Sequence, residues 1–598
     1  MRRDETEQDG ASTTPHLALG AMRGIAVSPG VAIGPAVVFN RNAIPVPHLS
    51  LPADEAPQEK QRLHEAILRS RARIERVRDA LPPTDAEHRL ILEAHLLMHR
   101  DELLMEATER AIDQGKNAEW ALEQTVDELA ARLVQAKESY LRERVRDLVH
   151  VKEGILGELT GVTHALPTIE VPSILVAVDL SPAEFLSLPR EHILGIVTEL
   201  GTSTGHTAIL ARALRIPAIV HAPRATRLIE KGQIVILDAR RGDVIIAPSE
   251  LERTNAEGRA IRYRTFTGKL RSHAPEHTTL KDGTPIEIFA NLELEEEVEE
   301  ALEARAEGVG LYRTEFLYLN GQVPSEEHLY EVFGRVGRAF HPHPVSIRTF
   351  DLGADKLPLG SPEVSHNPAL GLRGLRLALA RPQLFEAQLR AVLRASASTS
   401  LRLMFPMVTS VEEMREAKRI VRRVHTQLEH AGIEVGNVLV GAMIEVPAAA
   451  MMTRALAMEC DFFSIGTNDL AQYAMAADRN NPVVAQLASP IAPGLLQMLA
   501  LISEGARIRG IPTSVCGDMA ADPLALPLLL ALGFRSLSMS PSEIPLARAI
   551  CARLDRESLA SLEQEAMACV TTREVEAAIV HAVGDALGDL WHEHGLVL

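Results

Sequence analysis

The feature that most constrains the fold is a series of seven apolar, β-branched stretches, each of which ends near a charged or polar residue. Segments with helical periodicity separate most of them, which predicts parallel strands joined by crossover helices. Polar residues at the ends of many parallel strands are typical of the active-site face of a (β/α)8 barrel. The stretches are residues 286–291, 308–313, 345–348, 401–406, 440–445, 462–469 and 512–516.

Cationic side chains follow two of these predicted strands. Arg313 and Arg348 come from separate strands, and Lys356 lies a few residues beyond the second. Two guanidinium groups and an ammonium group that converge on one pocket would bind a phosphate and a carboxylate. Each arginine could instead pair with a structural carboxylate, but their shared position at strand ends favours an anion site.

Two carboxylates and a thiol follow three further strands. Glu445 and Asp469 lie at neighbouring strand ends, where carboxylates together with substrate oxygens would hold Mg²⁺. The alternative is a pair of salt bridges at the barrel end. Cys516 ends another strand and is either an acid–base group or a small buried hydrophobe. The set predicts a small, highly anionic substrate that binds with a divalent metal.

A histidine follows a glycine-rich turn in the middle of the chain. Residues 193–198 read as a strand, residues 199–205 as the turn, and His206 as the start of a helix. The N–H groups of a helix start favour an anion beside it, which suits a neutral imidazole that accepts a phosphoryl group. A histidine that only caps the helix remains an alternative on this motif alone.

A chain of 598 residues is too long for a single hydrophobic core, so we predict a multidomain protein of the α/β class. Shifts in composition along the chain indicate where the domains begin and end. Dense mixed charge and a heptad-like apolar stripe from Leu63 to Leu81 mark a helical segment inserted into a small α/β domain. The latter opens with two strands around Ser28-Pro29-Gly30. We predict a disordered leader (1–21), a split α/β domain (22–50 and 165–248), a helical insertion (51–164), a linker helix (249–275) and a barrel (276–598).

Bulk properties exclude several classes of protein. The net charge of −18 argues against a general nucleic-acid binder. No apolar run is long enough to cross a bilayer, and the N-terminus lacks the apolar segment of a signal peptide. The four cysteines have no disulfide-like spacing, so we expect a reduced, cytoplasmic setting. His95, His99 and Glu102 share a helical spacing that could bind a metal on one helix face, but no further ligands converge with them, so a zinc site is not favoured.

Taken in order, the motifs resemble Enzyme I of the bacterial phosphoenolpyruvate-dependent sugar phosphotransferase system, from about Met22 to the C-terminus. The resemblance implies a swivelling phosphohistidine domain with an inserted helical domain that docks the histidine phosphocarrier protein. It also implies a C-terminal barrel of the triosephosphate isomerase type that binds phosphoenolpyruvate and forms a homodimer. The matching stretches are residues 28–30, 210–212, 216–220, 307–317, 404–407, 461–470 and 478–479.

The resemblance also implies a role for individual residues. His206 would carry the phosphoryl group and Cys516 would donate the proton that completes pyruvate. Glu445 and Asp469 would bind Mg²⁺. The residues that would bind phosphoenolpyruvate are Arg313, Arg348, Lys356, Arg373, Asn468, Asp469 and Arg479.

This chain departs from the usual family pattern at several positions. The family usually has two adjacent glycines in the histidine loop and a serine before the histidine, whereas this chain has Gly201-Thr202 and Gly205-His206. None of the departures removes a residue with an implied chemical role, so we expect an active enzyme. The other substitutions are Ser181 for threonine, Ala354 for glycine, His366 for glutamate and Asp518 for glutamate.

Four other functions compete with this one. A pyruvate phosphate dikinase or phosphoenolpyruvate synthase would need a large ATP-binding domain, and we see no nucleotide loop in the helical segment. A nitrogen-regulatory paralogue would serve a different carrier. The altered loop before His206 favours a non-catalytic phosphoenolpyruvate sensor, but a sensor does not need Cys516 as a proton donor. A magnesium-dependent lyase would leave His206 unexplained.

Overall fold

The computed structural model describes residues 21–40, 44–52, 54–81, 86–99, 101–135, 139–162, 166–202, 205–272, 277–295, 297–318, 323–352, 367–479 and 484–594. The chain forms two compact units. The first comprises Met1–Val77, Glu106–Glu123 and His150–Tyr263, and the second comprises Arg78–Met105, Gln124–Val149 and Arg264–Leu598. The predicted leader lies almost wholly outside the described residues.

The first unit contains a mixed sheet of eight strands in the order β1-β8-β7-β3-β4-β5-β6-β2. β3 pairs in parallel with β4, so the sheet joins segments from both sides of the helical region. The strands are β1 (Ala21–Arg23), β2 (Ile25–Ser28), β3 (Val31–Phe39), β4 (Ser173–Ala177), β5 (Ile193–Thr198), β6 (Ala218–Val220), β7 (Ile234–Asp238) and β8 (Asp243–Ile246).

The two strands predicted around Ser28-Pro29-Gly30 are confirmed as β2 and β3, but the first of them is split at Gly24, so that β1 is a separate strand. A Cβ atom at this position would lie 2.6 Å from the Val220 carbonyl oxygen. The close approach of two backbones leaves room only for glycine. β1 therefore pairs with β8, and β2 pairs with β6 at the opposite edge of the sheet.

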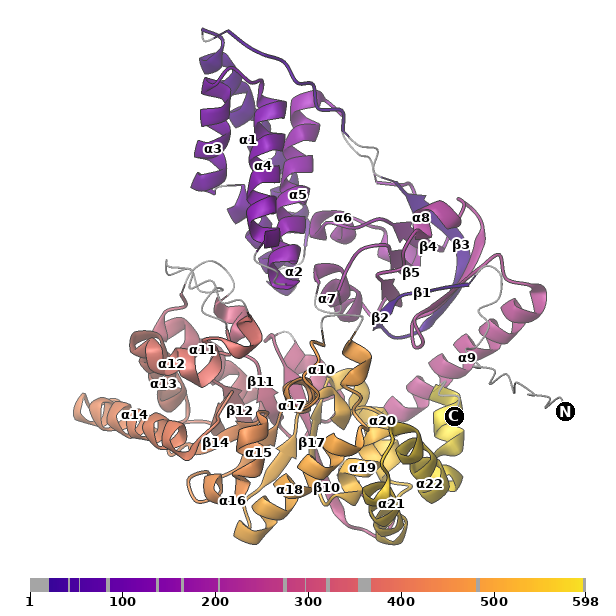
Figure 1. Ribbon diagram of the computed structural model, residues 1–598, viewed down its shortest axis with the longest axis vertical. Coiled ribbons are helices and arrows are strands. Elements are labelled where there is room, and N and C mark those ends of the chain that lie inside the picture. The colour runs from indigo at the N-terminus through magenta and orange to yellow at the C-terminus, as the bar shows by residue number, and fades with distance from the viewer. Residues whose placement is uncertain are drawn as a thin grey trace, which may run out of the picture. The chain divides into compact units, whose positions relative to one another are not determined.

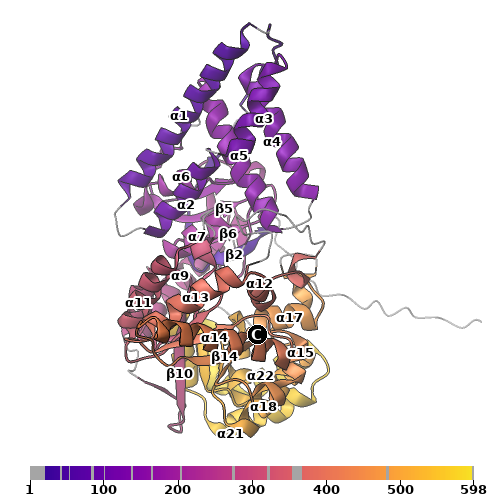
Figure 2. The same cartoon turned by 90° about the vertical axis from the view of Figure 1, so that its left-hand side faces the viewer.

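Five helices follow β3 along the chain. On α1 the predicted apolar stripe is confirmed at Leu63 and Ile67, which are buried. α1, α3, α4 and α5 lie side by side in both views (Figures 1 and 2). Arg62 of α1 forms an ion pair at 2.5 Å with Glu119 of α4. The helices are α1 (Ala56–Ala80), α2 (Ala86–Met98), α3 (Glu102–Asp113), α4 (Ala118–Gln135) and α5 (Ser139–Thr160).

The second unit contains the predicted barrel, which is confirmed. Eight strands from β10 to β17 pair in parallel, and β10 pairs with both β11 and β17 to close the sheet. The short β9 (Thr278–Thr279) pairs antiparallel with β10. The eight strands are β10 (Pro285–Leu292), β11 (Val309–Tyr312), β12 (Val345–Arg348), β13 (Leu401–Phe405), β14 (Leu439–Ile444), β15 (Phe463–Ile465), β16 (Thr513–Val515) and β17 (Ser536–Met539).

Helices surround the barrel strands and cover their outer faces (Figure 1). They are α10 (Glu297–Glu303), α11 (Glu326–Phe340), α12 (Gly374–Ala380), α13 (Pro382–Ala395), α14 (Val411–His430), α15 (Pro447–Met451), α16 (Thr453–Leu456), α17 (Thr467–Ala474), α18 (Pro493–Arg509), α19 (Ala525–Ala531), α20 (Ile544–Cys551), α21 (Arg556–Ala568) and α22 (Thr572–His594). No described helix combines the length and the apolar character that a membrane crossing requires.

Candidate active site

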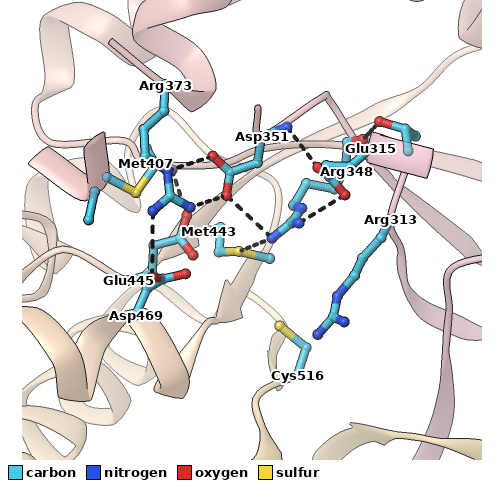
Figure 3. A network of polar contacts seen from close by, with 12 residues as sticks. Arg313, Glu315, Arg348, Asp351, Arg373, Met407, Met443, Glu445, Asp469 and Cys516 are labelled. Carbon is cyan, nitrogen blue, oxygen red and sulfur yellow. Dashed lines mark hydrogen bonds and ion pairs between the residues drawn. The ribbon is translucent and has the colours of Figure 1, made fainter. Parts of the chain in front are cut away.

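The predicted site residues of the barrel come together at the carboxyl ends of its strands. Arg313 follows β11, Arg348 ends β12 and Glu445 follows β14. Asp469 lies in the first turn of α17, directly after β15, and Cys516 follows β16. Figure 3 shows these side chains gathered at one end of the barrel. Parallel pairing explains the convergence, because it brings all the carboxyl ends of the strands to the same face.

Arg348 lies in a network of acidic side chains. Its Nη2 atom is 3.1 Å from Glu315 Oε2, and its Nη1 atom is 3.7 Å from Asp351 Oδ2 (Figure 3). Burial lowers the pKa of Arg348, but Glu315 and Asp351 outweigh it and the net direction is upward. Its buried Nε atom has no hydrogen-bond partner within the described residues. A charged guanidinium with an unused donor is suited to an anionic ligand.

Arg373 is fixed by a bidentate contact with Asp351, at 3.1 Å from Nε to Oδ1 and 2.6 Å from Nη2 to Oδ2. Its Nη1 atom donates to the Tyr473 hydroxyl at 3.1 Å and lies 3.7 Å from Asp469 Oδ1. The next residue, Gly374, has a φ of +56°. Asp351 therefore joins Arg348 to Arg373. Asp351 was not among the predicted site residues, although its spacing of three residues from Arg348 was a usable signal.

The carboxylates of Glu445 and Asp469 fit a divalent cation. Glu445 is 1% exposed, and its Oε1 atom accepts the Met407 amide at 2.6 Å. Burial, with the negative charges of Asp351 and Asp469, raises the pKa of Glu445 to about 8. Asp469 Oδ1 is buried without a hydrogen-bond partner among the described residues. Hard oxygen donors with excess negative charge are the ligands that Mg²⁺ prefers.

Cys516 is a buried thiol, with 2% exposure, whose Sγ atom donates to the Ile465 carbonyl at 3.4 Å. Burial raises its pKa to about 11, so the sulfur carries its proton at neutral pH. Figure 3 shows Cys516 beside the guanidinium of Arg313. The Asn291 side chain donates to the Cys516 carbonyl at 3.0 Å and holds the strand end in place. A protonated thiol in this position meets the requirement for a proton donor.

Arg313 contacts Glu293, a residue that the sequence analysis did not identify. Its Nη1 atom donates to Glu293 Oε1. Burial lowers the pKa of Arg313, but the charge of Glu293 more than offsets this effect and the net direction is upward. The signal for Glu293 was its place after the first predicted strand, two residues beyond Asn291.

The structure places the remaining predicted phosphoenolpyruvate-binding residues, Asn468, Arg479 and Lys356, in three different ways. Asn468 lies in the first turn of α17, and its side-chain oxygen accepts the Asp518 amide at 2.9 Å. Arg479 lies beyond the end of α17 with an exposed side chain. Lys356 lies outside the described residues, as do Ala354 and His366.

His206 belongs to the first unit and is the first residue of α7 (His206–Ala213), as predicted. Gly201 needs to be glycine, since its φ is +131° and a Cβ atom would lie 2.8 Å from Val220 Cβ. Gly205 has a φ of −71° and a ψ of 159°, which other residues adopt readily. The backbone conformation at position 205 therefore does not require the glycine that stands here in place of the usual serine. The Ser181 hydroxyl donates to Glu184 at 2.7 Å in the capping box of α6 (Pro182–Leu186).

The two histidines that were considered as zinc ligands, His95 and His99, form hydrogen bonds within the helical region. His95 Nε2 lies 3.2 Å from Asp147 Oδ1. The Nδ1 atom of His99 bonds to the carbonyl of His95, one turn earlier in α2, at 2.9 Å. The side chain of Glu102 lies outside the described residues.

Three family models match this chain, and together they span most of it. The model described as "PEP-utilising enzyme, N-terminal" matches residues 23–144. The model described as "PEP-utilising enzyme, mobile domain" matches residues 169–242. The model described as "PEP-utilising enzyme, PEP-binding domain" matches residues 269–556, which include the barrel site.

Whole-chain relatives bear the name phosphoenolpyruvate-protein phosphotransferase. One from Listeria innocua is 38% identical over 563 residues, which cover 93% of this chain and 98% of the relative. One from Bacillus subtilis is 38% identical over 93% of this chain and 99% of its own length. A relative from Mycoplasma pneumoniae is 35% identical over 93% of this chain and 98% of its own length. This chain therefore belongs to the phosphoenolpyruvate-protein phosphotransferase family.

Proposed function

We propose that the chain transfers the phosphoryl group of phosphoenolpyruvate to its own His206 and then to a histidine phosphocarrier protein. The reaction releases pyruvate and is the first step of a sugar phosphotransferase system. One observation carries the proposal. Arg313 and Arg348 meet a carboxylate pair and a protonated thiol at one end of the barrel. Family membership supplies the substrate class.

The arginines would bind the charged groups of the substrate. Arg348 has an unused Nε donor, and Arg313 lies beside Cys516 (Figure 3). Arg373 holds Asp351 and so fixes the position of Arg348. Asn468 lies at the same barrel end and would add a polar contact to the substrate. We assign Lys356 and Arg479 to the substrate on the family resemblance.

Glu445 and Asp469 would hold the divalent metal, and Mg²⁺ is the ion that we propose. A bound Mg²⁺ would neutralise charge on the phosphoryl oxygens and orient them for transfer. Asp469 Oδ1 has no hydrogen-bond partner among the described residues, and this observation and the raised pKa of Glu445 support the assignment.

The chemistry divides between two side chains. A neutral imidazole nitrogen of His206 attacks the phosphorus, the bond from phosphorus to the enol oxygen breaks, and that oxygen keeps the electron pair. The resulting enolate takes a proton at its terminal carbon from Cys516 Sγ and becomes pyruvate. The phosphoryl group then passes from His206 to a histidine of the carrier. His206 and the barrel belong to different units. The proposal therefore requires that His206 reach phosphoenolpyruvate at the barrel in one step and the carrier protein in the next.

The barrel unit would also form a homodimer. Large apolar side chains are exposed on α15, on α18 and between them, where a second copy would bury them. These are Met451, Met452, Met458, Leu501 and Ile508. All four cysteines are free, which fits the cytoplasmic setting that we propose.

The test is the intact mass of the protein after incubation with phosphoenolpyruvate and Mg²⁺. We expect one added phosphoryl group that acid removes and that is absent from His206→Gln. His221→Gln is the matched control, because His221 is an exposed histidine of the same unit, and it should accept phosphate normally. A phosphorylated His206→Gln would refute the assignment. Substrate binding without any added mass would favour the sensor.

A further inference from the structure

Glu293 and Arg313 occupy equivalent positions just past the ends of two neighbouring barrel strands. β10 and β11 are parallel, and Leu292 pairs with Tyr312 in their register. The Arg313 amide donates to the Leu292 carbonyl at 2.8 Å. The backbone therefore presents Glu293 and Arg313 side by side, and the carboxylate accepts a hydrogen bond from Arg313 Nη1.

The backbone of Glu293 is fixed at this position. Its amide donates to Glu297 Oε2 at 2.6 Å, and the amide of Leu294 donates to the same atom at 3.1 Å. Glu297 thus caps the loop between β10 and α10 with its side chain. As a result, a negative charge stands beside an arginine that we assign to an anionic substrate.

The acidic partners of Arg348 are held much more firmly. The Asp351 side chain is 2% exposed and binds Arg373 with both oxygens. Glu315 is 14% exposed, and its second oxygen accepts the Asp351 amide at 2.7 Å. The Glu293 side chain is 31% exposed, and within the described residues its carboxylate is hydrogen-bonded to Arg313 alone. Glu293 is therefore free to leave its partner for water, whereas Glu315 and Asp351 are not.

We propose that Glu293 is an internal competitor for Arg313, and that the substrate displaces it on binding. This inference rests on the proposed function, because it takes Arg313 to bind phosphoenolpyruvate. Glu293 acts as a positioning residue through Arg313 and does not touch the reacting atoms. Every anion that takes Arg313 from Glu293 meets the same cost of displacement, whereas an anion that leaves the pair intact meets none. Glu293 therefore weakens the binding of the ligands that use Arg313.

The test is the dissociation constant for phosphoenolpyruvate, measured by calorimetry with Mg²⁺ on the full chain, with His206→Gln in every protein so that no phosphoryl transfer contributes heat. Partly exposed ion pairs contribute little, so we expect Glu293→Gln to bind about three- to five-fold more tightly than the wild type. Pyruvate should gain no more than phosphoenolpyruvate does, so the ratio of the dissociation constant for pyruvate to that for phosphoenolpyruvate should not fall. Glu295→Gln is the matched control, because Glu295 lies in the same loop and pairs with the exposed Arg335. The control should leave the affinity unchanged.

A double-mutant cycle separates competition from a merely structural role. In an Arg313→Gln background, the gain from Glu293→Gln should disappear, because the contested guanidinium is absent. A wild type that binds phosphoenolpyruvate, with unchanged or weaker binding by Glu293→Gln, would overturn this inference alone. A gain that persists without Arg313 would also overturn it. A wild type that fails to bind phosphoenolpyruvate would refute the proposed function itself.

Discussion

Cys516 combines two properties that a proton donor needs, namely a bound proton at neutral pH and a place beside the cationic groups. Replacement by alanine removes the proton and leaves the arginines in place. We expect Cys516→Ala to release pyruvate about 100-fold more slowly, with nearly unchanged affinity for phosphoenolpyruvate. Steady-state pyruvate assays and calorimetry check this.

Cys460→Ala is the control, because Cys460 is another buried thiol whose pKa is raised, to about 12. It lies before β15, away from the strand ends that form the site. A normal rate of pyruvate release by Cys516→Ala would show that Cys516 only fills space.

Glu445 makes the stability of the metal-free protein depend on pH. A carboxyl group whose pKa rises from 4.5 to about 8 on folding keeps its proton in the folded state after the unfolded chain has released it. Stability therefore falls as pH increases between these two values, by about 1 kcal/mol per pH unit. We expect the melting temperature in EDTA to be lower at pH 7.5 than at pH 5.5.

Glu445→Gln should flatten this pH dependence, because the amide does not titrate. Added Mg²⁺ should raise the wild-type melting temperature more at pH 7.5 than at pH 5.5, since cation binding favours the ionised carboxylate. A wild type and variant with the same slope would show that Glu445 does not dominate the titration.

The positions of candidate site residues could be predicted best where a side chain stands at a strand end or just past it. Arg313, Glu445 and Cys516 were found this way and do converge in the structure. Glu315 was not predicted, because it lies two residues after Arg313 and so does not stand directly past the strand. Its contact with Arg348 depends on the pairing of β11 with β12, which no local pattern reveals.

At the scale of elements, the start of α12 controls where Arg373 points. Gly374 has a φ of +56°, and an added Cβ atom would lie 2.8 Å from Met407 Cβ. We expect Gly374→Ala to destabilise the protein by about 1–2 kcal/mol. It should also weaken phosphoenolpyruvate binding, because Arg373 anchors Asp351. Thermal unfolding and calorimetry measure the two effects.

Gly432→Ala is the matched control for the backbone effect. Gly432 also has a positive φ, of +73°, but an added Cβ atom would meet nothing within 4 Å. This variant should lose stability through backbone strain and keep its affinity for the substrate. Unchanged affinity in Gly374→Ala would mean that α12 does not determine the position of Arg373.

Seven barrel strands were predicted, and the eighth was not. β17 reads Ser-Leu-Ser-Met, which contains no β-branched residue and alternates serine with apolar residues. Ser538 is buried in the sheet, and its hydroxyl donates to the Asn291 side chain at 2.6 Å. The serines of β17 therefore kept this strand from being recognised in the sequence, and it is stabilised by pairing with its two neighbours.

At the scale of the whole molecule, the exposed methionines of α15 and its surroundings carry the prediction of a homodimer. We expect Met451→Lys combined with Met458→Lys to shift the protein toward a monomer, because two charges in an apolar interface resist burial. Sedimentation velocity measures the change. Val570→Lys, at another exposed apolar position, is the control. Dimers for all three proteins would place the interface elsewhere, and a monomeric wild type would refute the homodimer.

The overall architecture was predictable because its strands and helices carry strong periodic signals, and the barrel is confirmed. The split of the first strand at Gly24 was not predictable, since it results from the backbone of β6 approaching from a distant part of the sequence. The domain boundaries remain predictions.

The closure of the barrel by β10 and β17 has a consequence for synthesis of the protein on the ribosome. Asn291, which holds the Cys516 strand end, is itself fixed by Ser538, and β10 gains its second neighbour only when β17 is present. A nascent chain that has emerged only as far as Cys516 already contains every assigned ligand but lacks the strand that completes the ring. We therefore expect substrate affinity to appear only after β17 has emerged and paired with β10.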